Sequence, residues 1–154
     1  MKLTTLGYLI HGDSYLMLHR TKKANDPNHA KWIGVGGHIE NGETPDECFF
    51  REVNEETGLT LGSARLRGII TFLSDEWEDE LMFLYTSDDY TGTLTECDEG
   101  ELAFVPKDRI LTLPLWAGDR IFLQELLDGS PFFTLKLKYQ GEALTESVLD
   151  KSPL

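Results

Sequence analysis

The fold of this chain is decided by the stretch Gly37–Leu59, which reads GHIENGETPDECFFREVNEETGL. Its second half carries the signals of a helix over about residues 45–57. Thr44 suits the N-cap, a proline follows it at the first helical position, and Glu47 stands three residues after Thr44, as in a capping box. Gly58 supplies the left-handed residue that ends many helices. The pattern predicts a helix with well-defined ends, preceded by a loop.

Three glutamates of this helix share one face. At about 100° per residue, Glu52, Glu55 and Glu56 fall within an arc of roughly 100°. Like charges at this spacing repel one another and weaken a helix. A divalent cation that prefers oxygen ligands, Mg²⁺ or Mn²⁺, would offset the repulsion, and Arg51 could hold one carboxylate in a two-point pair. A solvated acidic face is the alternative, and the carboxylates alone leave both readings open.

The same stretch resembles the Nudix box. The pattern of that box is Gly, five residues, Glu, seven residues, Arg-Glu, an aliphatic residue, any residue, Glu-Glu, any residue, Gly and an aliphatic residue. This chain fills each defined position, with Gly37, Glu43, Arg51, Glu52, Val53, Glu55, Glu56, Gly58 and Leu59. So many fixed positions in one short stretch make chance a poor explanation.

The resemblance implies a fold and a chemistry. The fold is an α/β/α sandwich with a mixed central sheet, and the reaction is hydrolysis of a nucleoside diphosphate linked to another group. Glu52, Glu55 and Glu56 match the glutamates that bind Mg²⁺ in this family, with Mn²⁺ able to substitute. Arg51 and Glu43 match the pair that orients them.

Two further residues of the metal site are expected outside the helix. The resemblance makes the carbonyl of Gly37 a metal ligand, because a glycine carbonyl at the start of the box has this role in the family. Many members also take a glutamate from a later loop, either as a ligand or as the general base. Glu99 aligns best with that place, with Glu96 close behind. Glu56 and Glu99 are the two candidates for the base, and the sequence does not separate them.

Outside the box the chain resembles hydrolases of oxidised purine nucleoside triphosphates. In those enzymes a tryptophan followed by acidic residues holds the base, and Trp116 and Asp119 match this arrangement. An indole face suits a flat purine, although Trp116 could also be a core aromatic residue at a helix start. Two positions depart from the pattern. Gly118 stands where the first of two acids is expected, and Ile33 replaces an asparagine, which removes a base-reading hydrogen bond and leaves 8-oxoguanine specificity open.

A basic cluster formed by Arg20, Lys22 and Lys23 follows the second expected strand. It could be a solvated loop or a phosphate contact. Arg20 falls where triphosphate-hydrolysing members of the family commonly place a cation, so it is the residue expected to bind the substrate.

The remaining secondary structure follows from apolar runs and turn residues. A second helix is expected over about residues 119–127. Strands are expected over residues 3–10, 14–19, 66–73, 81–86, 102–105 and 132–139.

Length and composition set the broad class. The chain has 154 residues, 40% of them hydrophobic, and a formal net charge of −13. This predicts one domain spanning residues 1–154, with a loose tail from about residue 143. The negative charge argues against binding a nucleic-acid polymer, whereas a single nucleotide can be bridged to carboxylates by metal ions. No apolar run suits a membrane span and no secretion signal is visible, so a cytoplasmic location is expected.

These observations lead to one main functional hypothesis. The chain is expected to be a Mg²⁺-dependent hydrolase that converts a nucleoside triphosphate, such as 8-oxo-dGTP or another oxidised purine nucleotide, to the monophosphate and pyrophosphate. One alternative is a pyrophosphatase for another derivative, such as a nucleotide sugar or a pterin triphosphate. Another is a nucleotide-sensing module without catalysis. The sequence does not decide the oligomeric state.

Overall fold

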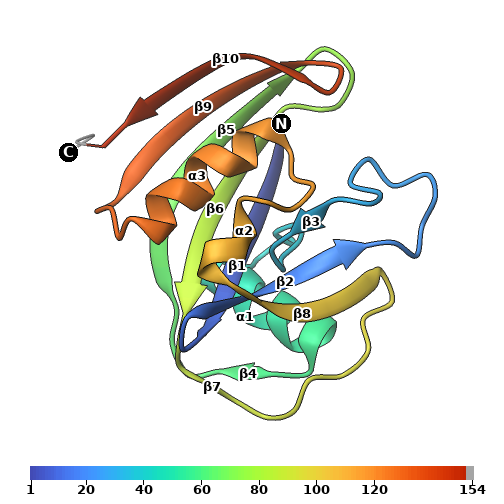
Figure 1. The fold of residues 1–154 in the computed structure, drawn as a ribbon, viewed down its shortest axis with the longest axis vertical. Helices are drawn as coiled ribbons and strands as arrows, with labels where there is room; N and C mark the ends of the chain where they lie inside the picture. The colour runs from blue at the N-terminus through green and yellow to red at the C-terminus, as the bar shows by residue number, and fades with distance from the viewer. Residues whose placement is uncertain (152–154) are drawn as a thin grey trace.

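A computed structural model describes residues 1–151, which form ten strands and three helices (Figure 1). The helices are α1 (Pro45–Thr57), α2 (Lys107–Ile110) and α3 (Ala117–Leu127). The strands are β1 (Lys2–His11), β2 (Ser14–Arg20), β3 (Trp32–Ile33), β4 (Thr60–Leu61), β5 (Arg65–Ser74), β6 (Glu80–Ser87), β7 (Tyr90–Thr91), β8 (Gly100–Pro106), β9 (Phe133–Gln140) and β10 (Ala143–Asp150).

One mixed sheet organises these elements. Its strand order is β10-β9-β5-β6-β1-β2-β3, and β8 also pairs with β2. The pairs β1 with β6 and β5 with β9 are parallel, and the other pairs are antiparallel. Strands β4 and β7 form a separate two-stranded sheet. The predicted α/β class, with a mixed sheet between helices, is confirmed.

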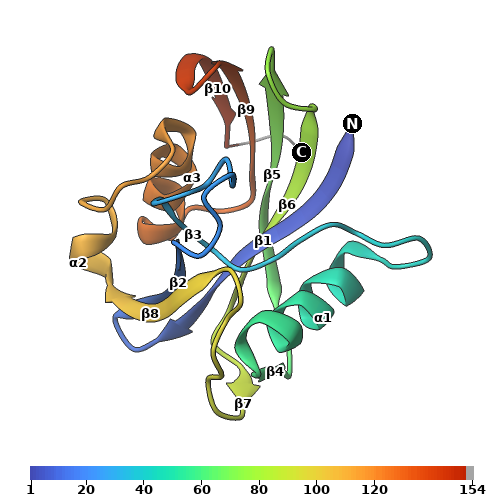
Figure 2. The same ribbon diagram turned by 90° about the vertical axis from the view of Figure 1, so that its right-hand side faces the viewer.

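Helices cover both faces of the sheet, with α1 on one side and α3 on the other (Figure 2). On the α1 side, Phe49 and Val53 are fully buried against strand residues. On the α3 side, Phe122 and Leu123 are fully buried in a second cluster. Each helix therefore buries one apolar stripe against the sheet, which leaves the neighbouring stripe of α1 free to carry polar side chains. No helix among the described residues is long and apolar enough to span a membrane.

The segment after β3 runs along the edge of β1. Gly7 exchanges two backbone hydrogen bonds with Val35, at 2.8 and 3.0 Å, and the Thr5 N–H donates to the Gly37 carbonyl at 2.9 Å. Gly36 has φ +156°, and a Cβ there would lie 2.0 Å from the Thr5 carbonyl oxygen. Only glycine allows so close an approach. This pairing sets the position of the loop that leads into α1.

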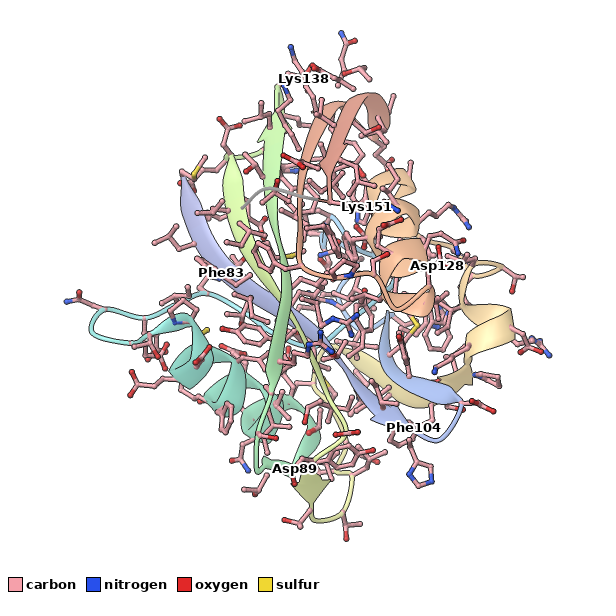
Figure 3. All side chains as sticks on the ribbon, turned by 90° about the vertical axis from the view of Figure 1, so that its left-hand side faces the viewer. Phe83, Asp89, Phe104, Asp128, Lys138 and Lys151 are labelled. Atoms are coloured by element: carbon pink, nitrogen blue, oxygen red, sulfur yellow. The ribbon has the colours of Figure 1, made fainter. Side chains whose placement is uncertain are left out.

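The expected loose tail is wrong for residues 143–150, which form β10 and pair along β9. Gly141, at φ +58°, makes the turn between the two strands. Leu144 and Leu149 pack against the core, and Lys151 Nζ lies 3.2 Å from Glu125 Oε1 of α3. Figure 3 shows Lys151 beside that helix. The rest of the expected tail, residues 152–154, lies outside the described residues.

Candidate active site

The acidic helix has the ends that its sequence predicts. The Thr44 hydroxyl accepts the Glu47 N–H, the Glu47 side chain accepts the Thr44 N–H, and Gly58 adopts a left-handed conformation at φ 78°. These caps satisfy backbone groups that would otherwise lack partners at the helix ends. The result is a rigid helix from Pro45 to Thr57 that presents its carboxylates at defined positions.

Arg51 connects the preceding loop to the carboxylates of α1. Its guanidinium forms a two-point pair with Glu43, with Nε 2.6 Å from Oε2 and Nη2 3.0 Å from Oε1. Nη1 lies 2.8 Å from Glu52 and 3.2 Å from Glu55, and Nη2 donates to the His38 carbonyl at 3.1 Å. The hydrogen bonds from Arg51 lower the pKa of Glu43 to about 2. Arg51 thus links the loop and helix by charge-assisted hydrogen bonds.

The carboxylates of Glu52, Glu56 and Glu99 lie close enough to affect one another's pKa. Burial is the main cause of a raised pKa at both Glu52 and Glu56, and the charge of Glu99 adds to each increase. The Gly36 N–H donates a hydrogen bond to Glu56 Oε2 at 2.8 Å, and this bond lowers the pKa of Glu56. By contrast, the Glu55 side chain is 58% exposed. Glu52, Glu56 and Glu99 therefore form a crowded acidic cluster, with Glu55 at its solvent edge.

The position of Glu99 is set by strand pairing that is distant in sequence. Gly100 pairs with Arg20 across β8 and β2, so Glu99 comes to lie beside the end of β2. Arg20 Nη1 lies 3.0 Å from Glu99 Oε2, and its Nε lies 2.6 Å from Asp26 Oδ2. Glu96 is exposed. Of the two alternatives in this loop, the structure brings Glu99 to the acidic cluster, and it places Arg20 there as well.

The structure suggests a different backbone metal ligand from the one that the sequence predicts. The Gly37 carbonyl, the predicted ligand, already accepts the Thr5 N–H. The Gly36 carbonyl accepts no hydrogen bond within residues 1–151, and the Gly36 N–H anchors Glu56. Gly36 is therefore a residue that the sequence reasoning missed. Its unengaged carbonyl makes it the better backbone candidate for contact with a cation.

The cluster fits a divalent cation by its donor chemistry. Among residues 1–151, no group of three or more His, Cys, Asp or Glu side chains is arranged so that it could hold a metal ion as it is. Carboxylate oxygens are nonetheless the ligands that Mg²⁺ and Mn²⁺ prefer. Burial disfavours the charged forms of Glu52 and Glu56, and Arg51 opposes this effect at Glu52. A cation held there would remove much of the cost of ionising buried carboxyl groups.

A separate pocket contains the residues expected to bind the base. Its volume is about 220 Å³, and Ile33, Trp116 and Asp119 all line it. Its other lining residues are Lys2, Leu6, Pro27, Asn28, Phe72, Leu73, Ser74, Trp77, Glu78, Glu80, Met82 and Tyr139. The short segment from Ile33 to Gly37 joins this pocket to the acidic cluster. The structure therefore places the predicted residues in two neighbouring places, the pocket and the acidic cluster.

Trp116 is held in this pocket by polar contacts that the sequence did not reveal. Its Nε1–H donates to Asn28 Oδ1 at 2.7 Å, and Lys31 Nζ lies 4.4 Å from the ring centroid. Lys31 is in turn 2.8 Å from Glu142 in the turn between β9 and β10. Trp77 and Tyr139 pack edge-on against the indole. Trp116 therefore packs against the core and also lines the pocket.

Asp119 is a buried carboxylate without a hydrogen-bond donor among residues 1–151. Its side chain lines the pocket and the residue is only 5% exposed. Burial, followed by the charge of Glu80, raises its pKa to about 7, and Lys31 partly opposes the shift. Because Asp119 lines the pocket, a ligand there could supply a hydrogen-bond donor to its carboxylate.

The raised pKa of Asp119 predicts that the free energy of unfolding depends on pH. Between about pH 4 and pH 7 the folded state holds a proton that the unfolded state releases, so the free energy of unfolding falls as pH rises through this window. Replacing Asp119 with asparagine should remove this part of the pH dependence. The variant should then be more stable than the parent at pH 8, by up to about 4 kcal/mol. Chemical denaturation at pH 5 and pH 8 measures the effect, with the exposed Asp108→Asn as control. Equal pH dependence in the parent and the Asp119→Asn variant would contradict the prediction.

Comparison with known proteins identifies the family. A model of the NUDIX domain matches residues 2–126. The chain belongs to the Nudix family. The uncharacterized Nudix hydrolase YvcI of Bacillus subtilis is 32% identical over 108 residues, which cover 67% of this chain and 68% of that protein. An oxidized purine nucleoside triphosphate hydrolase of Danio rerio is 33% identical over 124 residues, which cover 79% and 78% of the two chains.

A solved structure supports the same assignment. The MutT protein from Bacillus halodurans matches this fold with a TM-score of 0.88 and 26% identity, and the match covers 99% of this chain and 100% of that one. The protein is therefore a Nudix hydrolase. Enzymes of this family act on nucleotide substrates and generally use divalent metal ions.

Proposed function

We propose that this Nudix hydrolase is a Mg²⁺-dependent pyrophosphohydrolase of a nucleoside triphosphate with an oxidised purine base. The observation that carries the proposal is the short segment from Ile33 to Gly37. It joins a pocket containing Trp116 and the unpartnered Asp119 to the acidic cluster of α1. The spacing suits a ligand with a flat base at one end and phosphates at the other. The name of the Danio rerio relative supports the same substrate class.

The phosphate end has defined roles in this proposal. Glu52, Glu55, Glu56 and Glu99 would hold the cation together with a glycine carbonyl. A bound divalent cation supplies charge neutralisation at the phosphates and acidifies water. Arg51 keeps the carboxylates in place through its contacts with Glu43, Glu52 and Glu55. Arg20, already beside Glu99, offers a positive charge to the phosphates.

The reaction then needs one proton acceptor. A water oxygen attacks the α- or the β-phosphorus and forms a new P–O bond. The bond from that phosphorus to the oxygen that bridges the two breaks, and the products are the nucleoside monophosphate and pyrophosphate. Glu56 or Glu99 takes the proton from the attacking water. Both lie in the same cluster, so geometry alone keeps both as candidates.

The base end accounts for recognition. The part of the Trp116 indole that lines the pocket would contact a purine, and Asp119 would accept a hydrogen bond from an N–H on the edge of the base. Ile33 lines the same pocket and contributes no side-chain hydrogen bond. Recognition of the base edge would then depend on Asp119 and on polar groups from other elements.

A substrate panel tests the proposal. The purified protein with Mg²⁺ should release pyrophosphate, rather than orthophosphate, from 8-oxo-dGTP, at a kcat/KM roughly tenfold or more above that for dGTP. Removal of the metal with EDTA should abolish turnover, and Mn²⁺ should restore it.

The same panel should contain normal dNTPs, a nucleotide sugar, ADP-ribose and a pterin triphosphate. Equal rates on dGTP and 8-oxo-dGTP would exclude the preference for oxidised purines. Turnover confined to a nucleotide sugar or to the pterin triphosphate would support the rival pyrophosphatase. Nucleotide binding without any turnover would support a sensing module.

A further inference from the structure

The hydroxyl group of Tyr139 lies at the wall of the base pocket, and the fold uses it only as a hydrogen-bond acceptor. Strand β9 carries this residue along the face of the sheet that α3 covers (Figure 1). Tyr139 is 6% exposed, lines the pocket and packs edge-on against Trp116, with ring centroids 5.4 Å apart. A phenylalanine would fill the same apolar space but would leave the Gly118 N–H of α3 without this acceptor.

The hydrogen bonds of this hydroxyl are only half satisfied. Its oxygen accepts the Gly118 N–H at 2.7 Å. Within residues 1–151 no group accepts the hydroxyl proton in return. Buried tyrosine hydroxyls usually find a partner for this proton. Burial is the main cause that raises the pKa of Tyr139 to about 12, so the group stays protonated at physiological pH.

Gly118 and the hydroxyl compete for one space. A Cβ at position 118 would lie 2.6 Å from the Tyr139 Oη and 2.5 Å from Leu137 Cδ1. A side chain at 118 and a hydroxyl at 139 are therefore incompatible without a shift. The tyrosine hydroxyl occupies the space next to position 118 and still has a proton to donate.

We propose that Tyr139 is a specificity-determining residue whose hydroxyl donates a hydrogen bond to an acceptor atom of the base, beside Asp119. This inference rests on the proposed function of the same site. Asp119 accepts from an N–H of the base, and Tyr139 donates to the neighbouring oxygen or nitrogen. Such a pair suits a purine edge that places a donor next to an acceptor, as N1–H and O6 do in a 6-oxopurine. Asp119 and Tyr139 form the hydrogen bonds to the base edge that the side chain of Ile33 cannot form.

Replacement of Tyr139 with phenylalanine tests the donor. The variant should bind 8-oxo-dGMP about tenfold more weakly by calorimetry, because it loses one buried hydrogen bond. The KM for 8-oxo-dGTP should rise by a similar factor, with little change in kcat, and inhibition by inorganic pyrophosphate should be unaltered. Tyr90→Phe is the matched control, since that hydroxyl donates to the Ile10 carbonyl outside the pocket. Unchanged affinity for 8-oxo-dGMP in an active Tyr139→Phe variant would overturn the proposal and leave the proposed function standing.

A second set of variants needs no substrate. Gly118→Ala should lower Tm by roughly 4 °C or more in the parent protein, and by clearly less in the Tyr139→Phe background, where the hydroxyl is gone. Equal decreases in Tm in the two backgrounds would refute the competition between a side chain at position 118 and the Tyr139 hydroxyl. If the parent neither binds nor hydrolyses any nucleotide of the panel, the proposed function fails and the role of Tyr139 fails with it, while the Tm values still report on the packing.

Discussion

Glu56→Gln is expected to lower kcat by roughly 10³-fold while the protein keeps its fold. Glutamine has the shape of glutamate, so its amide oxygen can still accept the Gly36 N–H that Glu56 Oε2 accepts at 2.8 Å. The amide is a poorer metal ligand than a carboxylate and does not take a proton from water. Because burial strongly disfavours the charged form of Glu56, its neutral replacement should have an equal or higher Tm. The combination of lost activity and retained stability separates a functional role from a structural one.

The measurement compares steady-state kinetics, Mn²⁺ affinity and Tm across three variants. Glu56→Gln and Glu99→Gln address the two candidate bases, and Glu96→Gln is the control, because Glu96 is an exposed glutamate in the same loop as Glu99. The base is the residue whose replacement lowers kcat with the smaller loss of metal affinity. Activity of the Glu56→Gln variant within tenfold of the parent would contradict the assignment of Glu56 to the reaction.

The sequence predicted those parts of the site that depend on local interactions. The ends of α1 follow from the pair Thr44 and Glu47 at one end and Gly58 at the other, each bonded to a group no more than four residues away, and the structure has the helix over the predicted residues 45–57. The convergence of Glu52 and Glu56 on one face follows from helix geometry in the same way. Such features need no knowledge of the distant chain.

The features that the sequence did not predict depend on contacts between distant elements. The Gly36 N–H anchors Glu56 across twenty residues, and Asn28 binds Trp116 across 88. The hydrogen bond from Gly118 to Tyr139 depends on how α3 sits on β9. The alternation of residues in β9 could have indicated that Tyr139 faces inward with Leu137, but not which group its hydroxyl contacts.

Strand β10 was missed for a different physical reason. It is an edge strand with most of its residues exposed, and its two packed residues, Leu144 and Leu149, are five apart. A register shift between Leu144 and Glu146 breaks the regular pairing. The sequence therefore lacks the alternation that marks a half-buried strand. The strand forms because it pairs with β9 in a hairpin, which the local sequence pattern does not reveal.

Arg51→Lys should lower kcat/KM by about 10²-fold, although the positive charge is kept. A lysine ammonium is a single compact donor group, whereas the guanidinium holds Glu43 through two atoms and reaches Glu52, Glu55 and the His38 carbonyl at the same time. Its loss would release the loop before α1 from the helix. A displacement of about 1 Å in a catalytic group is enough for a loss of this size.

The same change should cost stability, because the buried part of this network loses partners. We expect a decrease of about 1–3 kcal/mol in the free energy of unfolding, measured by chemical denaturation alongside kinetics on 8-oxo-dGTP. Arg109→Lys is the matched control, since Arg109 is an exposed arginine of α2. If the Arg51→Lys variant kept both parental kcat/KM and stability, charge alone would suffice at this position. The two-point pair with Glu43 would then have no part in placing the carboxylates.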